Sequence, residues 1–229
     1  MVDIIAHRGA SATHHENTIS AFNEAFRLGA QGIELDVHLC ASGEPVVIHD
    51  NALERTTNGH GLIEGYTAQE LNEFDAGDGE RIPTLDKVLG SYHTRKTRFW
   101  IELKQERAAA AVAALITSYV STKRYEYEQL IVISSLHTSL QEVIRINPNI
   151  VTGATLYQEP ESLSEVLEFT GADFILPEHD IVTDALMEKA RQHDVNVIAW
   201  TVNNLFRANA LKKLGVHGII TDDVKILLE

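Results

Sequence analysis

The chain has 229 residues, 44% of them hydrophobic, and a formal net charge of -14 from 19 basic and 33 acidic residues. This acidity argues against general binding to nucleic acid or to anionic membranes, because both require a basic face. No apolar run approaches the roughly 20 residues that a membrane helix needs, and the N-terminal stretch shows no signal-peptide pattern. We therefore expect no nucleic-acid partner, no insertion into a membrane and, with Cys40 as the single cysteine, a cytoplasmic protein without internal disulfides.

Short apolar runs typical of strands alternate with amphipathic stretches along almost the whole chain. We expect strands over 3–7, 32–37, 45–49, 99–103, 130–135, 151–157, 173–177, 195–202 and 217–221. Two of the intervening helices have clear ends, one between Thr18 and Gly29 and the other between Asn204 and Gly215. Apolar strands alternating with helices indicate a parallel sheet covered on both faces. A closed α/β TIM (β/α)8 barrel fits the length, with an open doubly wound sheet as the alternative.

Nine strands are one too many for such a barrel, and the segment "GIELDVHLCASGEPVVIHD" (32–50) explains the surplus. The stretch 41–44 is too short for a helical crossover, so we expect a β-hairpin centred on Ser42-Gly43. In that register Asp36 lies directly opposite His49, and directly opposed residues share a face of the sheet. The second hairpin strand is then an addition, and the other eight strands close the barrel.

One stretch, 51–83, breaks the alternation because it is polar and rich in glycine. Long loops of this kind are often lids or binding loops, so we expect an insertion that caps the active-site end of the barrel. The sequence contains no internal repeat and no low-complexity linker. We therefore expect residues 1–229 to form a single domain.

Glu34 and Asp36 are two positions apart on a strand that otherwise looks buried, so their side chains share one face. Unpaired buried carboxylates tend to take up a proton, so a positive group is needed between them. Active sites of such barrels form at the carboxyl ends of the strands, where Glu102 also lies. Three carboxylates suit a hard cation, and we expect one divalent ion, Mg2+ or Ca2+. The alternative is a structural network with Arg8 and Lys104.

Other polar residues collect at the same strand ends. His7 and His49 are suited to act as a general acid and base, although a single histidine is more often a structural hydrogen-bonding group. Arg8 and Lys104 supply positive charge that suits phosphate oxygens, or else neutralise the carboxylates. Trp200 forms either a flat apolar wall for a substrate or part of the core. Cations, a metal and an acid–base pair together indicate cleavage of a phosphate ester.

Several short motifs resemble, in their order, those of the glycerophosphodiester phosphodiesterase family. They are "HRG" (7–9), "ENT" (16–18), "ELD" (34–36), "HD" (49–50), "RTTNGHG" (55–61), "RIPTLDKVL" (81–89), "IELK" (101–104), "WTVNN" (200–204) and "GIITD" (218–222). Three positions depart from the usual pattern: His15 and Val224 stand where the family usually has proline, and Ser42 replaces the aspartate of the hairpin turn. None of these departures removes a proposed ligand or proton carrier.

The resemblance implies a phospholipase C-like TIM barrel that hydrolyses glycerophosphodiesters to sn-glycerol 3-phosphate and an alcohol. Such substrates are deacylated phospholipids, for example glycerophosphocholine or glycerophosphoethanolamine. The resemblance also implies that His7 and His49 act as acid and base. It implies that a divalent cation is bound by Glu34, Asp36 and Glu102, and that phosphate is contacted by Arg8 and Lys104. Related barrels form a cyclic intermediate by attack of a substrate hydroxyl, and the sequence leaves open whether water attacks directly here.

Two other functions remain as alternatives. A lysophospholipase D or sphingomyelinase D type of activity would need an apolar groove, for which 51–83 offers only scattered apolar residues. A non-catalytic barrel that binds phosphodiesters is less expected, because the charged set is complete. The sequence does not indicate the head group, the choice between Mg2+ and Ca2+, which histidine is the base, or the oligomeric state.

Overall fold

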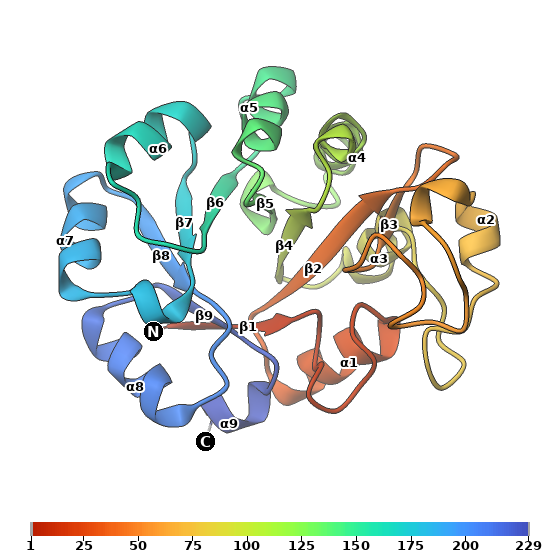
Figure 1. The fold of residues 1–229 in the computed structure, drawn as a ribbon, viewed down its shortest axis with the longest axis horizontal. Coiled ribbons are helices and arrows are strands. Elements are labelled where there is room, and N and C mark those ends of the chain that lie inside the picture. The colour runs from red at the N-terminus through yellow and green to blue at the C-terminus, as the bar shows by residue number, and fades with distance from the viewer. Residues whose placement is uncertain (1, 229) are drawn as a thin grey trace.

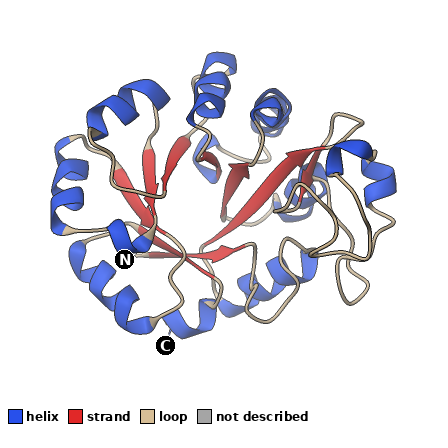
Figure 2. Cartoon of the chain, viewed as in Figure 1, coloured by secondary structure: helices blue, strands red, loops and turns tan. Residues whose placement is uncertain are grey.

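The computed structural model describes residues 2–228 and contains a closed barrel of parallel strands surrounded by helices (Figure 1 and Figure 2). The barrel strands are β1 (Asp3–His7), β2 (Gly32–Leu39), β4 (Arg98–Leu103), β5 (Leu130–Ser134), β6 (Thr152–Leu156), β7 (Phe174–Pro177), β8 (Asn196–Ala199) and β9 (Gly218–Thr221). They pair in the order β1-β9-β8-β7-β6-β5-β4-β2, and β1 also pairs with β2, which closes the ring. This confirms the TIM barrel and excludes the open sheet.

Helices lie between successive strands and cover the outside of the barrel (Figure 1). They are α1 (Ile19–Leu28), α3 (Leu85–Tyr92), α4 (Ala109–Ser121), α5 (His137–Ile146), α6 (Leu163–Thr170), α7 (Asp184–Gln192), α8 (Leu205–Leu214) and α9 (Val224–Leu228). The expected ends of α1 and α8 are confirmed, because Thr18 and Asn204 cap their first turns and Gly29 and Gly215 end them in the left-handed conformation. Within residues 2–228 no helix has the length and hydropathy of a membrane span.

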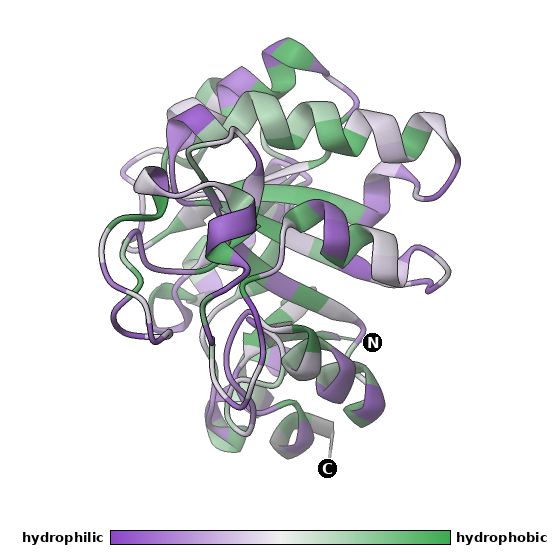
Figure 3. Cartoon of the chain, turned by 90° about the vertical axis from the view of Figure 1, so that its right-hand side faces the viewer, coloured by the Kyte–Doolittle hydropathy of each residue, from purple (hydrophilic) through white to green (hydrophobic). Residues whose placement is uncertain are grey.

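The interior of the barrel changes from apolar to charged toward the carboxyl ends of its strands. A cluster of buried apolar side chains fills the middle, formed by Ile5, Trp100, Ile131, Ile133, Leu176, Ile198 and Ile220. Because side chains alternate along a strand, the residue two positions further on points into the same interior. His7 follows Ile5 in this way, and Glu102 follows Trp100. A larger apolar core lies between the barrel and the helices. In Figure 3 the helices alternate between hydrophobic (green) and hydrophilic (purple) residues along their lengths.

Strand β3 (Pro45–Val47) pairs antiparallel with β2, as the expected hairpin requires, but the register differs by one residue. The Ile48 N–H donates to the carbonyl of Asp36, so Asp36 pairs with Ile48, and the prediction that it lies opposite His49 is wrong. The reason is the turn, in which 41–43 form a three-residue loop with Gly43 at φ +84°. A three-residue loop with a left-handed glycine shifts the pairing relative to the two-residue turn that we expected.

The insertion 51–83 contains the short helix α2 (Ala68–Leu71) and has a small apolar core shared with the hairpin. The buried members of this core are Cys40, Val46, Ile48, Leu53, Ile63, Ala68, Leu71, Ala76 and Ile82. Apolar residues that looked scattered in the sequence therefore pack together and hold the insertion against β3. In Figure 1 the insertion, coloured orange to yellow, lies beside the ring of strands next to β3.

Candidate active site

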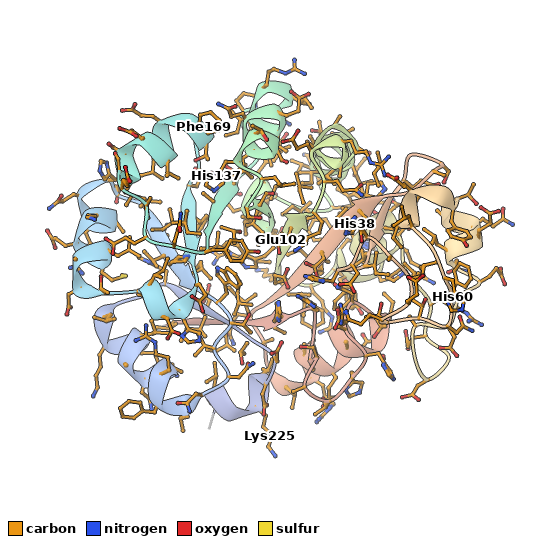
Figure 4. The ribbon with its side chains drawn as sticks, viewed as in Figure 1. His38, His60, Glu102, His137, Phe169 and Lys225 are labelled. Carbon is orange, nitrogen blue, oxygen red and sulfur yellow. The ribbon has the colours of Figure 1, made fainter. Side chains whose placement is uncertain are left out.

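Three carboxylates meet inside the mouth of the barrel. Asp36 and Glu102 are direct partners in the register of β2 and β4, and Glu34 lies two positions earlier on β2. One carboxylate oxygen from each residue lies within 4.8 Å of the other two. Glu34 and Asp36 are buried, and Figure 4 shows Glu102 near the centre of the ring of strands. The structure therefore brings together the three acidic residues that the sequence singled out.

The acidic trio of Glu34, Asp36 and Glu102 is only partly neutralised by protein groups. Burial raises the pKa of Glu34 well above its ordinary value, and the charges of Asp36 and Glu102 raise it further. Burial also raises the pKa of Glu102. Glu34 Oε1 is buried and has no hydrogen-bond partner among the described residues. An all-oxygen set with an unpartnered buried oxygen is the environment that a hard divalent cation satisfies, so the residues present fit such an ion.

Arg8 and Lys104 border the acidic trio. The Nε atom of Arg8 lies 3.1 Å from Asp36 Oδ2, and its backbone N–H donates to Glu34 Oε2 at 3.0 Å. Lys104 Nζ lies 3.5 Å from Asp36 Oδ1 and 3.5 Å from Glu102 Oε1. Burial alone would raise the pKa of Asp36, but the charges of Arg8 and Lys104 outweigh it and lower this pKa. Two cationic side chains therefore contact the acidic trio, as in the structural network that the sequence left as the alternative to a bound cation.

His7 is held at the carboxyl end of β1 by a carboxylate from the far end of the chain. Its Nδ1 is hydrogen-bonded to Asp222 Oδ1 at 2.6 Å, and its Nε2 lies 3.9 Å from Glu34 Oε2. Burial would raise the pKa of Asp222, but hydrogen bonds from His7, Asn203 and Ser11 lower it to about 2. An ionised Asp222 favours a proton on Nδ1 of His7 and so leaves Nε2 directed toward the acidic trio.

His49 lies where the chain leaves the hairpin, and it is paired with its sequence neighbour. Its Nδ1 is hydrogen-bonded to Asp50 Oδ1 at 2.6 Å, and its carbonyl oxygen is 2.9 Å from His38 Nε2. Regular pairing of β3 ends at Val47, before His49. The one-residue difference in register therefore does not carry the imidazole away from the cavity, which it lines.

All predicted site residues except Asp36 line one cavity of about 160 Å³. One wall is charged and comprises His7, Arg8, Glu34, His49, Glu102 and Lys104, while the facing wall is largely apolar and includes Ile133, Tyr157, Leu176, Trp200 and Ile220. The Trp200 Nε1 donates to the Leu176 carbonyl at 2.6 Å, and the Tyr157 ring stands edge-on to the indole at 5.1 Å. Trp200 is thus both fixed by its hydrogen bond and exposed to the cavity. Asp36 lies behind the charged wall, in contact with Arg8 and Lys104.

A model of the glycerophosphoryl diester phosphodiesterase family matches residues 7–226. The chain belongs to this family. A glycerophosphodiester phosphodiesterase from Caldanaerobacter subterraneus subsp. tengcongensis is 36% identical over 98% of this chain and 96% of its own length. One from Bacillus altitudinis is 31% identical over 97% of this chain and 95% of its own length. The structure of a phosphodiesterase from Oleispira antarctica in complex with the product sn-glycerol-3-phosphate is 26% identical, has a TM-score of 0.91 and covers 99% of this chain and 95% of that one.

Membership of the glycerophosphoryl diester phosphodiesterase family makes the protein an enzyme, a phosphodiester hydrolase. Several polar residues that contact the predicted site residues were not assigned roles from the sequence. Asp222 pairs with His7, and the Asn17 side chain donates to Asp36 Oδ2 at 2.9 Å. Glu16 forms an ion pair with Arg55. Each of them lies inside a motif that carried the family resemblance. Polar side chains within those motifs were therefore the signal that could have identified them.

Proposed function

We propose that the enzyme hydrolyses glycerophosphodiesters, such as glycerophosphocholine or glycerophosphoethanolamine, to sn-glycerol 3-phosphate and an alcohol. The observation that carries the proposal is the shared cavity, in which two histidines and two cationic side chains border the acidic trio. The Oleispira antarctica relative was solved with sn-glycerol-3-phosphate, which supports a substrate of this class. We further propose that 51–83 belongs to the same domain and borders the active-site end.

We propose that Glu34, Asp36 and Glu102 hold one divalent cation, Mg2+ or Ca2+. Their oxygens converge, and the pKa of Glu34 is raised by burial and by repulsion from Asp36 and Glu102, which a cation would relieve. When bound, such an ion neutralises phosphate charge and lowers the pKa of the attacking hydroxyl group. Arg8 and Lys104 would then contact the phosphate oxygens from the same wall, Arg8 with its planar guanidinium and Lys104 as a point charge.

His7 and His49 are the proposed acid and base. One imidazole takes the proton from the attacking oxygen, of water or of a substrate hydroxyl, as this oxygen bonds to phosphorus. The other donates a proton to the alcohol oxygen as its bond to phosphorus breaks. The Nδ1 atom of His7 is hydrogen-bonded to Asp222, and that of His49 to Asp50. Each imidazole therefore has Nε2 available for proton transfer.

The apolar wall contributes to substrate binding. We propose that Trp200 packs its indole face against carbon atoms of the substrate, because this side chain lines the cavity opposite the charged groups. Because this wall is apolar, a lysophospholipase D or sphingomyelinase D type of activity remains the second candidate. Turnover of glycerophosphocholine compared with that of lysophosphatidylcholine separates the two, and we expect the substrate without an acyl chain to be preferred.

The decisive experiment combines substrate, metal and mechanism. Release of sn-glycerol 3-phosphate from a panel of glycerophosphodiesters is measured with chelated enzyme, and then with Mg2+ or Ca2+ restored singly. We expect chelation to abolish turnover and one cation to restore it. The variants His7→Ala and His49→Ala should both be inactive with a folded barrel, because neither imidazole belongs to the apolar core. Wild-type rates in both variants would rule out the acid–base assignment.

A further inference from the structure

Arg55, in the motif "RTTNGHG" of the insertion, connects two carboxylates that contact residues lining the cavity. Its Nε and Nη2 atoms donate to the two oxygens of Asp50 at 2.6 and 2.9 Å. Its Nη1 and Nη2 atoms donate to the two oxygens of Glu16 at 2.9 and 2.8 Å. A guanidinium can donate paired hydrogen bonds to two carboxylates because its donors lie in one plane, whereas the ammonium group of lysine cannot.

Each of these carboxylates also holds a residue of the proposed site. Asp50 Oδ1 is hydrogen-bonded to His49 Nδ1 at 2.6 Å, and Glu16 Oε1 accepts from Arg8 Nη1 at 2.9 Å. The contacts therefore run without interruption from the imidazole of His49 through Arg55 to the guanidinium of Arg8. They join three separate segments of chain, namely the loop after β1, the end of the hairpin and the insertion.

We propose that Arg55 is a positioning residue that fixes His49 and Arg8 relative to one another, so that the insertion takes part in the reaction without touching the substrate. The proposal rests on the proposed function, because it takes the roles of His49 and Arg8 from there. A displacement of about 1 Å in such groups is enough to lower a rate about 100-fold.

A purely stabilising role does not explain this arrangement. The Arg55 side chain is 48% exposed, and ion pairs at such positions contribute little to stability. Its electrostatic effect is instead directed at the two carboxylates that hold site residues. Hydrogen bonds from Arg55 lower the pKa of Asp50, and those to Glu16 lower the pKa of Glu16 against the effect of its burial. Both carboxylates are thereby kept ionised as acceptors for His49 and Arg8.

The test is Arg55→Gln, assayed with glycerophosphocholine and a saturating divalent cation. We expect kcat to fall about 10- to 100-fold, because a residue that orients other groups of a site has an effect of this size. We expect KM to change much less than kcat, and the melting temperature to shift by less than about 4 °C. The matched control is Arg81→Gln in the same insertion, whose side chain donates to the Glu73 carbonyl at 3.3 Å and should leave kcat within about twofold.

Double-mutant cycles show whether Arg55 acts through its two partners. In an Asp50→Asn or a Glu16→Gln background part of the connection is already broken, so Arg55→Gln should lower kcat by a smaller factor than it does in the wild type. Arg55→Lys restores charge without the planar fork, so its kcat should lie between those of wild type and Arg55→Gln. If Arg55→Gln does not fold, Arg55→Lys decides, and a reduced kcat with an unchanged melting temperature supports the proposal.

Three results would overturn the inference: a wild-type kcat in Arg55→Gln, an equal loss in Arg81→Gln, or losses that multiply fully in both backgrounds. If Arg55→Gln does not fold, a wild-type kcat in Arg55→Lys has the same force. The fate of the proposed function is read separately from His49→Ala. An inactive His49→Ala beside a fully active Arg55→Gln would remove only the role of Arg55. A fully active His49→Ala would remove the acid–base assignment itself.

Discussion

The Nδ1 atom of His7 lies 2.6 Å from Oδ1 of Asp222, although 215 positions separate the two residues in the chain. Closure of the barrel creates this pair, because β1 and β9 are adjacent parallel strands in which Ala6 lies opposite Thr221. His7 and Asp222, the next residues along the chain, then lie at the same edge of the barrel. The first and last strands of the fold thus jointly build one proposed catalytic group.

This pairing predicts that Asp222→Asn lowers kcat about 10²- to 10⁴-fold, the usual contribution of a positioned acid or base. The amide keeps the size of the side chain but loses the charge that holds the proton on His7 Nδ1. Because the pKa of Asp222 is lowered to about 2, the carboxylate is ionised throughout the pH range of the assay. The measurement is the rate of sn-glycerol 3-phosphate release at saturating substrate.

Asp180→Asn is the matched control for Asp222→Asn. Asp180 also pairs with a histidine, His179, at 2.9 Å, but neither residue lines the cavity. We expect its kcat to stay within about twofold of wild type. Equal losses in the two variants would show that the His7 pair has no special part in the reaction.

The acidic trio predicts opposite effects of Glu34→Gln on stability and on activity. Without a cation, Glu34→Gln should raise the melting temperature at pH values above the raised pKa of Glu34, because it removes a charge that burial and the repulsion of Asp36 and Glu102 disfavour. The raised pKa of Glu34 also sets how stability depends on pH. The contribution of Glu34 to folding stability is complete below its unfolded-state pKa near 4.5 and is lost as pH rises through its folded-state pKa. The variant should lack this decline, and it should be inactive.

Thermal unfolding with added Mg2+ or Ca2+ completes that test. A cation that binds the folded wild type should stabilise it by about 2.7 kcal/mol at a concentration of 100 Kd, and Glu34→Gln should respond far less. The conservative change Asp173→Asn, outside the acidic trio, should respond as the wild type does. Identical responses of wild type and Glu34→Gln would show that the trio is not where the cation binds.

Most of the fold could be predicted because its signals are local. Strand and helix alternation, the caps of α1 and α8 and the surplus hairpin strand all follow from short-range patterns. The hairpin register could not, since "CASGE" allows two turn lengths, and only the hydrogen bond from the Cys40 N–H to the Glu44 carbonyl decides between them. The shared core of the insertion and hairpin was also missed, because it joins apolar residues that are distant in the sequence and show no period.

The site was predictable to a similar depth. Residues at strand ends, such as His7 and Glu102, are placed by topology alone, because all parallel strands end at the same rim. Asp222 also lies at a strand end, but its role depends on one hydrogen bond that no pattern encodes. The role of Arg55 was harder still to predict from the sequence. It reaches Asp50 and Glu16 from an irregular segment whose path is fixed by packing, and sequence spacing carries no information about such a path.

The aromatic edge of the cavity predicts an effect on binding rather than on chemistry. Trp200→Ala should raise KM for glycerophosphocholine about tenfold and lower kcat less, because it removes apolar contact area on the wall opposite the charged groups. Phe206→Ala is the control, since Phe206 is an exposed aromatic residue, 86% accessible, that does not line the cavity. A loss in kcat alone for Trp200→Ala would contradict a binding role.

Gly9, directly after Arg8, predicts the tightest limit on substitution near the site. Its φ is +84°, and a Cβ there would lie 2.7 Å from the carbonyl carbon of Ala21. Gly9→Ala should therefore destabilise the fold by more than about 2 kcal/mol, since left-handed strain and overpacking add, and should displace Arg8. Gly43 has the same φ with open space around it, so Gly43→Ala should lose only about 1 kcal/mol by urea unfolding. Equal losses in the two variants would mean that backbone strain alone, and not contact with α1, keeps glycine beside Arg8.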